Sequence, residues 1–206
     1  MGLYRDYLFP RLMDRVLGTG QVHKLRRKTL TGINGEVLEI GFGTGLNLAH
    51  YTHEVRHLTT IEPERVLPER VSQRIAAAPF PVRQLHLDAA GKLPLDDDSF
   101  DFVVSTFTLC SIQEVLAALR EVRRLLKPDG RFVFLEHGRS DDAGIARWQD
   151  RLNPVQKVLG CGCHLNRPID QLIKAGGLEI TTLDRFVMEG APQITGEMYR
   201  GTAVIR

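Results

Sequence analysis

The residues most suited to ligand chemistry lie early in the chain. An apolar run that contains the acidic Glu39 is followed by three closely spaced glycines, Gly41, Gly43 and Gly45. Glycine has no Cβ atom, so the backbone turns sharply there and a ligand can approach it closely. The pattern predicts a buried strand, a glycine turn and a helix from about Thr44, whose free N–H groups favour a carboxylate or phosphate. Leu46 replaces the third glycine of the dinucleotide fingerprint, so a nicotinamide oxidoreductase is disfavoured.

Two further acidic residues follow the next two predicted strands. Glu62 ends the strand 55–61 and Asp88 ends the strand 82–87. In open α/β sheets, ligands bind beyond the carboxyl ends of the strands, and a carboxylate about 20 residues after the glycine turn binds ribose hydroxyls. We therefore predict that Glu62 contacts a ribose.

The elements that would position these residues alternate between strand and helix. Strands are expected at 37–40, 55–61, 82–87, 100–106 and 131–135, and helices at 67–78 and after a capping box at 111–114. Further on, a helix around Trp148 is disturbed by Pro154, a short helix begins at Pro168, and strands follow at 178–186 and 201–206. This alternation predicts βαβ units and a doubly wound, mostly parallel sheet.

The ordered motifs of residues 36–138 resemble those of the class I S-adenosylmethionine-dependent methyltransferases of type 11. The run 93–101 is similar to the acidic turn before their fourth strand, and the run 125–130 completes the ordered set. The resemblance implies a seven-stranded Rossmann-like fold, S-adenosylmethionine as cofactor and S-adenosylhomocysteine as co-product. It places Asp88 and Ala89 at the adenine. The full implied set of cofactor-binding residues is Glu39, Gly41, Gly43, Gly45, Glu62, Asp88, Ala89 and Thr106.

A narrower resemblance concerns the methyl acceptor. Thr-Leu-Cys-Ser at 108–111, Glu-His-Gly at 136–138, the Trp148 helix and Gly-Cys-His-Leu-Asn-Arg at 162–167 resemble the thiol S-methyltransferases of the methyltransferase-like 7 type. His164 stands where that group has asparagine, and no hydrophobic anchor like theirs precedes residue 31. The resemblance implies a small thiol as acceptor. The residues expected at the acceptor are Phe107, Cys110, Arg139, Trp148, His164 and Arg167.

Several of these residues have two interpretations. His137 is either the base that removes the acceptor's proton or a hydrogen-bonded residue that shapes its loop. Cys110 is interpreted as a small buried group rather than a nucleophile, because methyl transfer needs no covalent intermediate. Phe107 and Trp148 are pocket walls or plain core residues. The C-x-C-H run at 161–164 lacks the second ligand pair of a zinc site, so no metal is expected.

The amino-terminal segment, residues 1–31, is predicted as a helical cap, and residues 32–206 as the methyltransferase domain. Apolar residues from Leu3 to Leu17 repeat at helical spacing, interrupted at Pro10 and accompanied by Arg11 and Arg15. The alternative is a helix that lies in a lipid interface. We favour the cap, because the segment's charge and length are modest for an anchor.

Composition narrows the remaining function classes. The 206 residues suit one domain, and the net charge of +2 with no basic stripe argues against a nucleic-acid partner; Arg26-Arg27-Lys28 is interpreted as a solvated helix face. Three cysteines and no signal peptide or apolar span predict a cytoplasmic protein, with membrane contact disfavoured. The oligomeric state is left open. The rival functions are N-methylation of an amine or phospholipid headgroup, and a non-catalytic scaffold that retains the cofactor fold.

Overall fold

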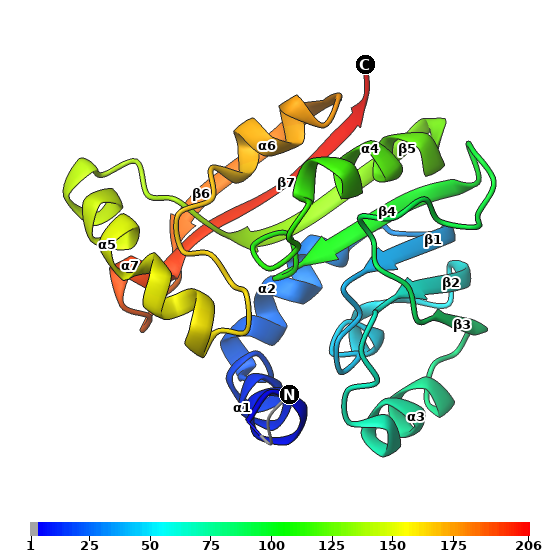
Figure 1. Cartoon of the computed structure of the whole chain (residues 1–206). Coiled ribbons are helices and arrows are strands. Elements are labelled where there is room, and N and C mark those ends of the chain that lie inside the picture. The colour runs from blue at the N-terminus through cyan, green and yellow to red at the C-terminus, as the bar shows by residue number, and fades with distance from the viewer. Residues whose placement is uncertain (1–3) are drawn as a thin grey trace.

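The computed structural model of the chain describes residues 4–206, which form a seven-stranded sheet with helices on both faces (Figure 1). The strand order is β3-β2-β1-β4-β5-β7-β6. Strands β1 to β5 pair in parallel, and β7 runs antiparallel to both of its neighbours. This arrangement confirms the predicted doubly wound, mostly parallel sheet. The order reverses between β1 and β4, where a ligand crevice is expected in such folds.

The strands are β1 (Gly35–Ile40), β2 (Val55–Ile61), β3 (Val82–Leu85), β4 (Phe100–Thr106), β5 (Leu126–His137), β6 (Leu178–Val187) and β7 (Glu197–Ile205). In β1 the fully buried Val37 and Leu38 point into different core clusters, one on each face of the sheet. Because both faces are covered, the central strands are continuous apolar runs rather than alternating ones.

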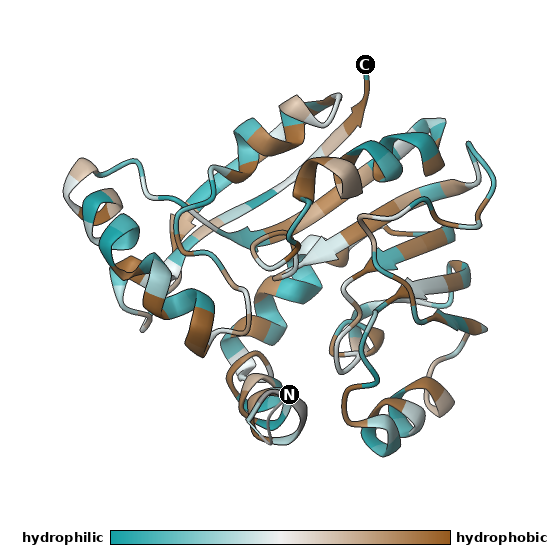
Figure 2. Cartoon of the chain, viewed as in Figure 1, coloured by the Kyte–Doolittle hydropathy of each residue, from teal (hydrophilic) through white to brown (hydrophobic). Residues whose placement is uncertain are grey.

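The helices are α1 (Phe9–Val16), α2 (Gly20–Leu30), α3 (Pro68–Ala76), α4 (Val115–Leu125), α5 (Ala143–Leu159), α6 (Ile169–Ala175) and α7 (Gln193–Gly196). A π-helical turn, η1 (Tyr4–Leu8), precedes α1, and a 3-10 turn, η2 (Leu48–His50), follows the glycine turn. Helices α4 and α6 cover one face of the sheet, and α2 with α3 covers the other. Both α4 and α6 carry hydrophobic and hydrophilic stripes, as helices with one buried face do (Figure 2).

The helix predicted to begin near Thr44 is absent, and that prediction was wrong. Beyond Gly45 the chain makes successive tight turns that end in η2. The Asn47 amide and the Tyr51 hydroxyl are both drawn to the Glu39 carboxylate, at 3.0 and 2.7 Å. These contacts pull the segment back onto the end of β1, so no helix N-terminus faces the glycine turn.

Other local predictions also need correction. The capping box does not form, because α4 begins at Val115 with Glu114 as its N-cap and no side-chain cap. The Ser111 hydroxyl instead lies 3.5 Å from the Cys110 sulfur. Helix α5 continues through Pro154.

The predicted amino-terminal cap contains two helices with different surroundings. Its residues 1–3 lie outside the described part of the chain. Residues of α1 line a cavity, whereas α2 packs on the sheet with Val22 and Leu30 each only 2% exposed. The proposed division at residue 31 therefore separates α2 from a core to which it contributes. No helix in residues 4–206 has the length and hydropathy needed to cross a membrane.

Candidate cofactor and acceptor site

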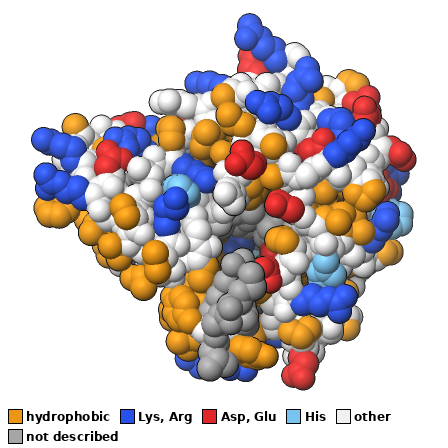
Figure 3. Space-filling model, in the orientation of Figure 1, with side chains coloured by type: hydrophobic (Ala, Val, Ile, Leu, Met, Phe, Trp, Pro, Cys, Tyr) orange, Lys and Arg blue, Asp and Glu red, His pale blue; other side chains and the backbone are white. Residues whose placement is uncertain are grey.

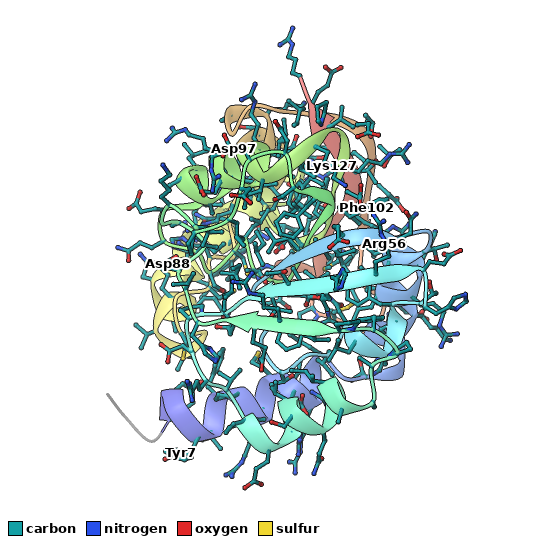
Figure 4. The ribbon with its side chains drawn as sticks, turned by 90° about the vertical axis from the view of Figure 1, so that its right-hand side faces the viewer. Tyr7, Arg56, Asp88, Asp97, Phe102 and Lys127 are labelled. Carbon is teal, nitrogen blue, oxygen red and sulfur yellow. The ribbon has the colours of Figure 1, made fainter. Side chains whose placement is uncertain are left out.

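A cavity of about 750 Å³ lies at the carboxyl ends of the parallel strands, with α1 on its other side. Figure 4 shows the polarity of the sheet: Asp88, in the cavity lining, lies at the end to which β3 points, and Arg56 and Lys127 lie at the opposite end. The cavity therefore occupies the position that the sheet topology predicts for a ligand.

The glycine turn forms one wall of the cavity. Gly41 has a φ of +71°, and a Cβ atom there would lie 2.1 Å from the Thr108 side chain, so only glycine fits. Gly43 has a φ of +54° and nothing within 4 Å of where its Cβ would be. A ligand can thus lie directly against the Gly43 backbone. Gly45 is buried in the turn and does not line the cavity.

Glu39 lies behind this turn and is only 1% exposed. Burial raises the pKa of Glu39 to about 7, although the Tyr51 hydrogen bond and the charge of Arg26 act in the opposite direction. Glu39 lines the cavity and holds Asn47 and Tyr51 in place.

Arg26 is a cavity residue that sequence reasoning missed. It is 4% exposed, and its guanidinium donates to the side-chain oxygens of Asn47, at 2.7 Å, and Thr106, at 2.8 Å. Its Nε atom is buried without a hydrogen-bond partner among the described residues. Burial lowers the pKa of Arg26 to about 10, so the side chain remains charged at neutral pH.

The interpretation of Arg26-Arg27-Lys28 as a solvated face was therefore wrong for Arg26, although Arg27 and Lys28 are exposed. The sequence signal that could have identified Arg26 as buried is its helical spacing. Val22, Arg26 and Leu30 recur every four residues and share the buried face of α2.

Glu62 and Asp88 both line the cavity, together with Ala89. The Glu62 carboxylate accepts hydrogen bonds from the backbone N–H of Gly43, at 2.8 Å, and of Glu64, at 3.3 Å. One Asp88 oxygen accepts from the Ala90 N–H at 2.9 Å. The structure thus brings the predicted ribose and adenine residues to one cavity with the glycine turn. Their contacts with those groups remain predictions.

A loop after β4 forms another wall of the cavity. Its residue Phe107 has a φ of +55°, a conformation that costs free energy for a non-glycine residue. The fully buried Glu136 of β5 accepts hydrogen bonds from the backbone N–H groups of Thr108, at 2.9 Å, and Leu109, at 3.1 Å, and from the Ser105 hydroxyl at 2.6 Å. Glu136 therefore holds the loop that presents Phe107 and Cys110 to the cavity.

His137 lies next in β5 and also lines the cavity. Its Nε2 atom is 2.9 Å from the Cys163 sulfur, which in turn lies 3.6 Å from the Cys110 sulfur. Burial lowers the pKa of His137, but its contact with Cys163 and the charge of Glu136 outweigh burial, so the pKa is raised above its ordinary value. The contact with Cys110, together with burial, raises the pKa of the Cys163 thiol.

Four residues predicted at the acceptor do not line the cavity: Arg139, Trp148, His164 and Arg167. Arg139 pairs with Asp150 at 2.6 Å, and Trp148 is 53% exposed beneath the Arg151 guanidinium. The His164 ring contacts Asn153, and Arg167 donates to the Leu109 carbonyl behind the loop. These contacts turn the four side chains away from the cavity, so their prediction as acceptor walls needs correction.

Helix α1 supplies lining residues for which the motifs gave no signal, namely Phe9, Pro10, Met13 and Asp14. The buried Asp14 carboxylate accepts from the Thr44 hydroxyl at 2.6 Å and from Arg74 at 2.7 Å, and it also pairs with Arg70. Asp14 therefore fastens α1 to both the glycine turn and α3.

The cavity residues suit S-adenosylmethionine, the cofactor that the resemblance implies. The Glu62 and Asp88 carboxylates are acceptors for ribose hydroxyls and an adenine amino group. The charged side chain of Arg26, which lines the cavity, suits a carboxylate such as that of the methionine part. Open space at Gly43 leaves room for the ligand between them. The chemistry of the site thus fits an adenosine with an amino acid attached.

Comparison with known proteins supports the same family. A family model described as a methyltransferase domain matches residues 38–134. The chain is 36% identical over 145 residues to thiol S-methyltransferase TMT1B of Rattus norvegicus, an alignment that covers 68% of this chain but 59% of that protein's length. It is 30% identical over 139 residues to phosphatidylethanolamine N-methyltransferase of Cereibacter sphaeroides, covering 66% of this chain and 68% of that protein.

Solved structures agree on the fold. A SAM-dependent methyltransferase of Methanosarcina mazei superposes with a TM-score of 0.66 at 20% identity, covering 86% of this chain and 95% of that one. The [4+2]-cyclase SpnF superposes with a TM-score of 0.68 at 18% identity, covering 90% and 80%. At such identities the likeness concerns the fold alone. With the family model, the curated relatives and the cavity residues taken together, the chain belongs to the class I S-adenosylmethionine-dependent methyltransferases, and S-adenosylmethionine is its cofactor.

Proposed function

We propose that the protein transfers the methyl group of S-adenosylmethionine to the sulfur of a small thiol. The observation that carries this proposal is the make-up of the acceptor side of the cavity. Among the described residues, those on the β4 and β5 side are apolar, sulfur-containing or uncharged polar groups plus His137: Phe107, Cys110, Ser111, Ile112, Gln113, His137, Gln156, Cys161 and Cys163. A cationic amine would need a carboxylate partner to replace lost water, whereas a thiol needs none.

A thiol also makes the smallest demand on proton transfer. Its reactive thiolate is already a few per cent populated at neutral pH. The thiol S-methyltransferase relative points to the same acceptor class, although this chain spans only 59% of that protein.

The chain's own residues would act as follows. When bound, S-adenosylmethionine supplies an electrophilic methyl group on a sulfonium, and the chain supplies binding, orientation and electrostatics. Glu62, Asp88 and Arg26 would hold it against the glycine turn. His137 would take the proton of the acceptor S–H, with Nε2 exchanging its contact with the Cys163 sulfur for one with the acceptor. The acceptor sulfur then bonds to the methyl carbon, the old carbon–sulfur bond breaks towards the sulfonium, and a neutral thioether results.

The experiment compares rates for a small alkyl thiol across pH in the full chain, His137→Gln and His164→Gln. The wild-type rate should rise as pH approaches the thiol pKa. His137→Gln should lower turnover by roughly 10²-fold, a typical general-base contribution, with unchanged affinity for S-adenosylhomocysteine. His164→Gln is the matched control, because His164 lies outside the cavity lining. Equal loss in both variants would contradict the role of His137.

A second candidate, N-methylation of a phospholipid headgroup, is favoured by one surface feature. Helices α1 and α5 both contribute to the cavity lining, and η1, α1 and α5 also expose large apolar side chains to solvent. Figure 3 shows hydrophobic side chains gathered on that part of the surface. The members of this apolar rim are Tyr7, Leu8, Leu12, Val16, Trp148, Val155, Val158 and Leu159. The phosphatidylethanolamine N-methyltransferase relative suggests the same acceptor.

Flotation with vesicles of phosphatidylethanolamine and an anionic phospholipid tests this candidate. A lipid acceptor requires that the wild type floats and methylates the headgroup, and that Leu12→Asp with Val158→Asp does neither. Leu183→Asp is the control, since Leu183 is an exposed leucine on β6, outside the rim. If the wild type remains in solution and methylates thiols only, the lipid candidate fails.

A further inference from the structure

Three potential metal ligands meet on the acceptor side of the cavity. Cys110 Sγ, His137 Nε2 and Cys163 Sγ all lie within 4.8 Å of one another. They come from the loop after β4, from the end of β5 and from the loop after α5, and all three residues line the cavity. Among the side chains that the structure describes, no other group of three has this geometry. The sequence drew attention to the run Cys161–His164, but only Cys163 of that run belongs to the cluster.

The spacing of these atoms suits a tetrahedral zinc ion. Zn–S bonds of about 2.3 Å and Zn–N bonds of about 2.0–2.1 Å place two sulfurs about 3.8 Å apart, and a sulfur and a nitrogen about 3.5 Å apart. The two cysteine sulfurs are 3.6 Å apart, close to that value. His137 Nε2 and Cys163 Sγ are 2.9 Å apart because they share a hydrogen bond. A zinc ion that replaces the shared proton has to increase this distance by about 0.6 Å.

The backbone holds the cluster in place without a metal. The His164 N–H donates to the Cys110 carbonyl at 2.9 Å, which ties together the two loops that carry the cysteines. Glu136 holds the loop of Cys110 through the N–H of Leu109. Arg167, fixed on the Leu109 carbonyl, places a positive charge near both cysteines. Metal ligands are oriented in this way by groups behind them.

We propose that Cys110, His137 and Cys163 bind Zn²⁺, and that the fourth position, open to the cavity, takes the sulfur of the acceptor thiol. The second part rests on the proposed thiol methylation. Three protein ligands with one open position are the pattern of catalytic rather than structural zinc sites. Two thiolates balance the charge of the ion.

Protons and electrons balance without any redox partner. Zinc binding releases one proton from each cysteine thiol, and His137 binds as the neutral imidazole. The acceptor thiol loses its proton to solvent when it coordinates, because a metal-bound thiol is deprotonated. Its sulfur then forms the bond to the methyl carbon as the carbon–sulfur bond to the sulfonium breaks, and the neutral thioether, a weak ligand, leaves. In the zinc-bound protein His137 is a ligand, and the metal replaces it as the means of deprotonating the acceptor.

Cobalt(II) provides a spectroscopic test with the full chain. The purified protein is stripped with a chelator under a non-thiol reductant and titrated with Co²⁺. One equivalent should produce thiolate-to-cobalt charge-transfer bands and tetrahedral d–d bands, and Zn²⁺ should abolish both. Cys110→Ser and Cys163→Ser should lose the charge-transfer intensity, whereas Cys161→Ser, the matched control, should keep it. Calorimetry with S-adenosylhomocysteine identifies any variant that has lost its fold.

Adding an alkyl thiol to the cobalt-loaded protein tests the fourth position, and a shift of the charge-transfer bands is expected. Absence of thiolate–cobalt bands in the folded wild type overturns the zinc site, and methylation of thiols at the same rate before and after metal removal overturns its catalytic role. Neither result affects the proposed function. Cobalt bands without any thiol methylation would refute the proposed function and leave the metal site standing.

Discussion

Arg26 and Glu62 line the cavity from different elements and are suited to different parts of the cofactor. Arg26 is buried, charged and lines the cavity, which suits the carboxylate of the methionine part. Glu62 is bound to the Gly43 N–H at the glycine turn, which suits the ribose. The two assignments can be separated with a pair of ligands.

S-adenosylhomocysteine carries both the ribose and the carboxylate, whereas 5′-methylthioadenosine carries only the ribose. Arg26→Gln should weaken binding of S-adenosylhomocysteine by about 1–3 kcal/mol, the cost of losing a hydrogen bond to a charged group, and leave 5′-methylthioadenosine unaffected. Glu62→Gln should weaken binding of both ligands. Calorimetry measures these affinities, and 5′-methylthioadenosine binding also reports that Arg26→Gln is folded. An equal effect of Arg26→Gln on both ligands would refute the carboxylate assignment.

At the residue scale, local motifs predicted the cofactor side of the site better than the acceptor side. Gly41, Glu62 and Asp88 sit at strand ends, and the strand order alone brings such positions together. Cys163 and Arg139 depend instead on the path of the chain after β5. The ion pair with Asp150 holds the Arg139 side chain outside the cavity. The hydrogen bond from the His164 N–H to the Cys110 carbonyl places the neighbouring Cys163 beside the cavity. Such long-range pairings leave no periodicity in the sequence.

At the scale of elements, α1 is held over the cavity chiefly by Asp14. Burial raises the pKa of Asp14, but its hydrogen bonds with Arg74, Thr44 and Arg70 outweigh burial and lower the pKa to about 2. A carboxylate whose folded-state pKa is lowered stabilises the fold above its ordinary pKa, here 3.8, and this contribution is lost as pH falls towards 2. The docking of α1 should therefore weaken in acid.

Asp14→Asn should accordingly lower the thermal midpoint at pH 7, and the difference from the wild type should shrink as pH falls from 4 to 2. Scanning calorimetry at several pH values measures this difference. Asp129→Asn, at an exposed position near the start of β5, should show no such trend. A difference between Asp14→Asn and the wild type that is independent of pH would mean that the charge of Asp14 does not fasten α1.

The elements also show where sequence patterns were sufficient. Strands β1, β2 and β4 were predicted closely because buried parallel strands are continuous apolar runs. The helix expected at Thr44 failed because Glu39 competes for Asn47 and Tyr51, a tertiary effect that no local propensity contains. The capping box failed because a motif of four residues does not fix where a helix begins.

At the scale of the whole molecule, the cavity joins parts of the chain that lie far apart in sequence. Its cofactor side comes from the glycine turn, the loop after β2 and α2, and its acceptor side from the ends of β4 and β5 and the loop after α5. Helix α1 closes the cavity, and the Tyr4 hydroxyl donates to the Leu159 carbonyl at the end of α5. The amino-terminal segment therefore contacts both the cofactor side and the acceptor side of the molecule.

The most direct test of the central claim is a competition between acceptors. The full chain receives S-adenosylmethionine labelled with ¹³C in its methyl group, together with an alkyl thiol, a primary amine, a phenol and phosphatidylethanolamine vesicles at equal concentration. Mass spectrometry follows each labelled product and S-adenosylhomocysteine. We predict that the label appears on the thiol sulfur, in an amount equal to the S-adenosylhomocysteine released. Label on the amine, phenol or lipid with none on the thiol would contradict the account.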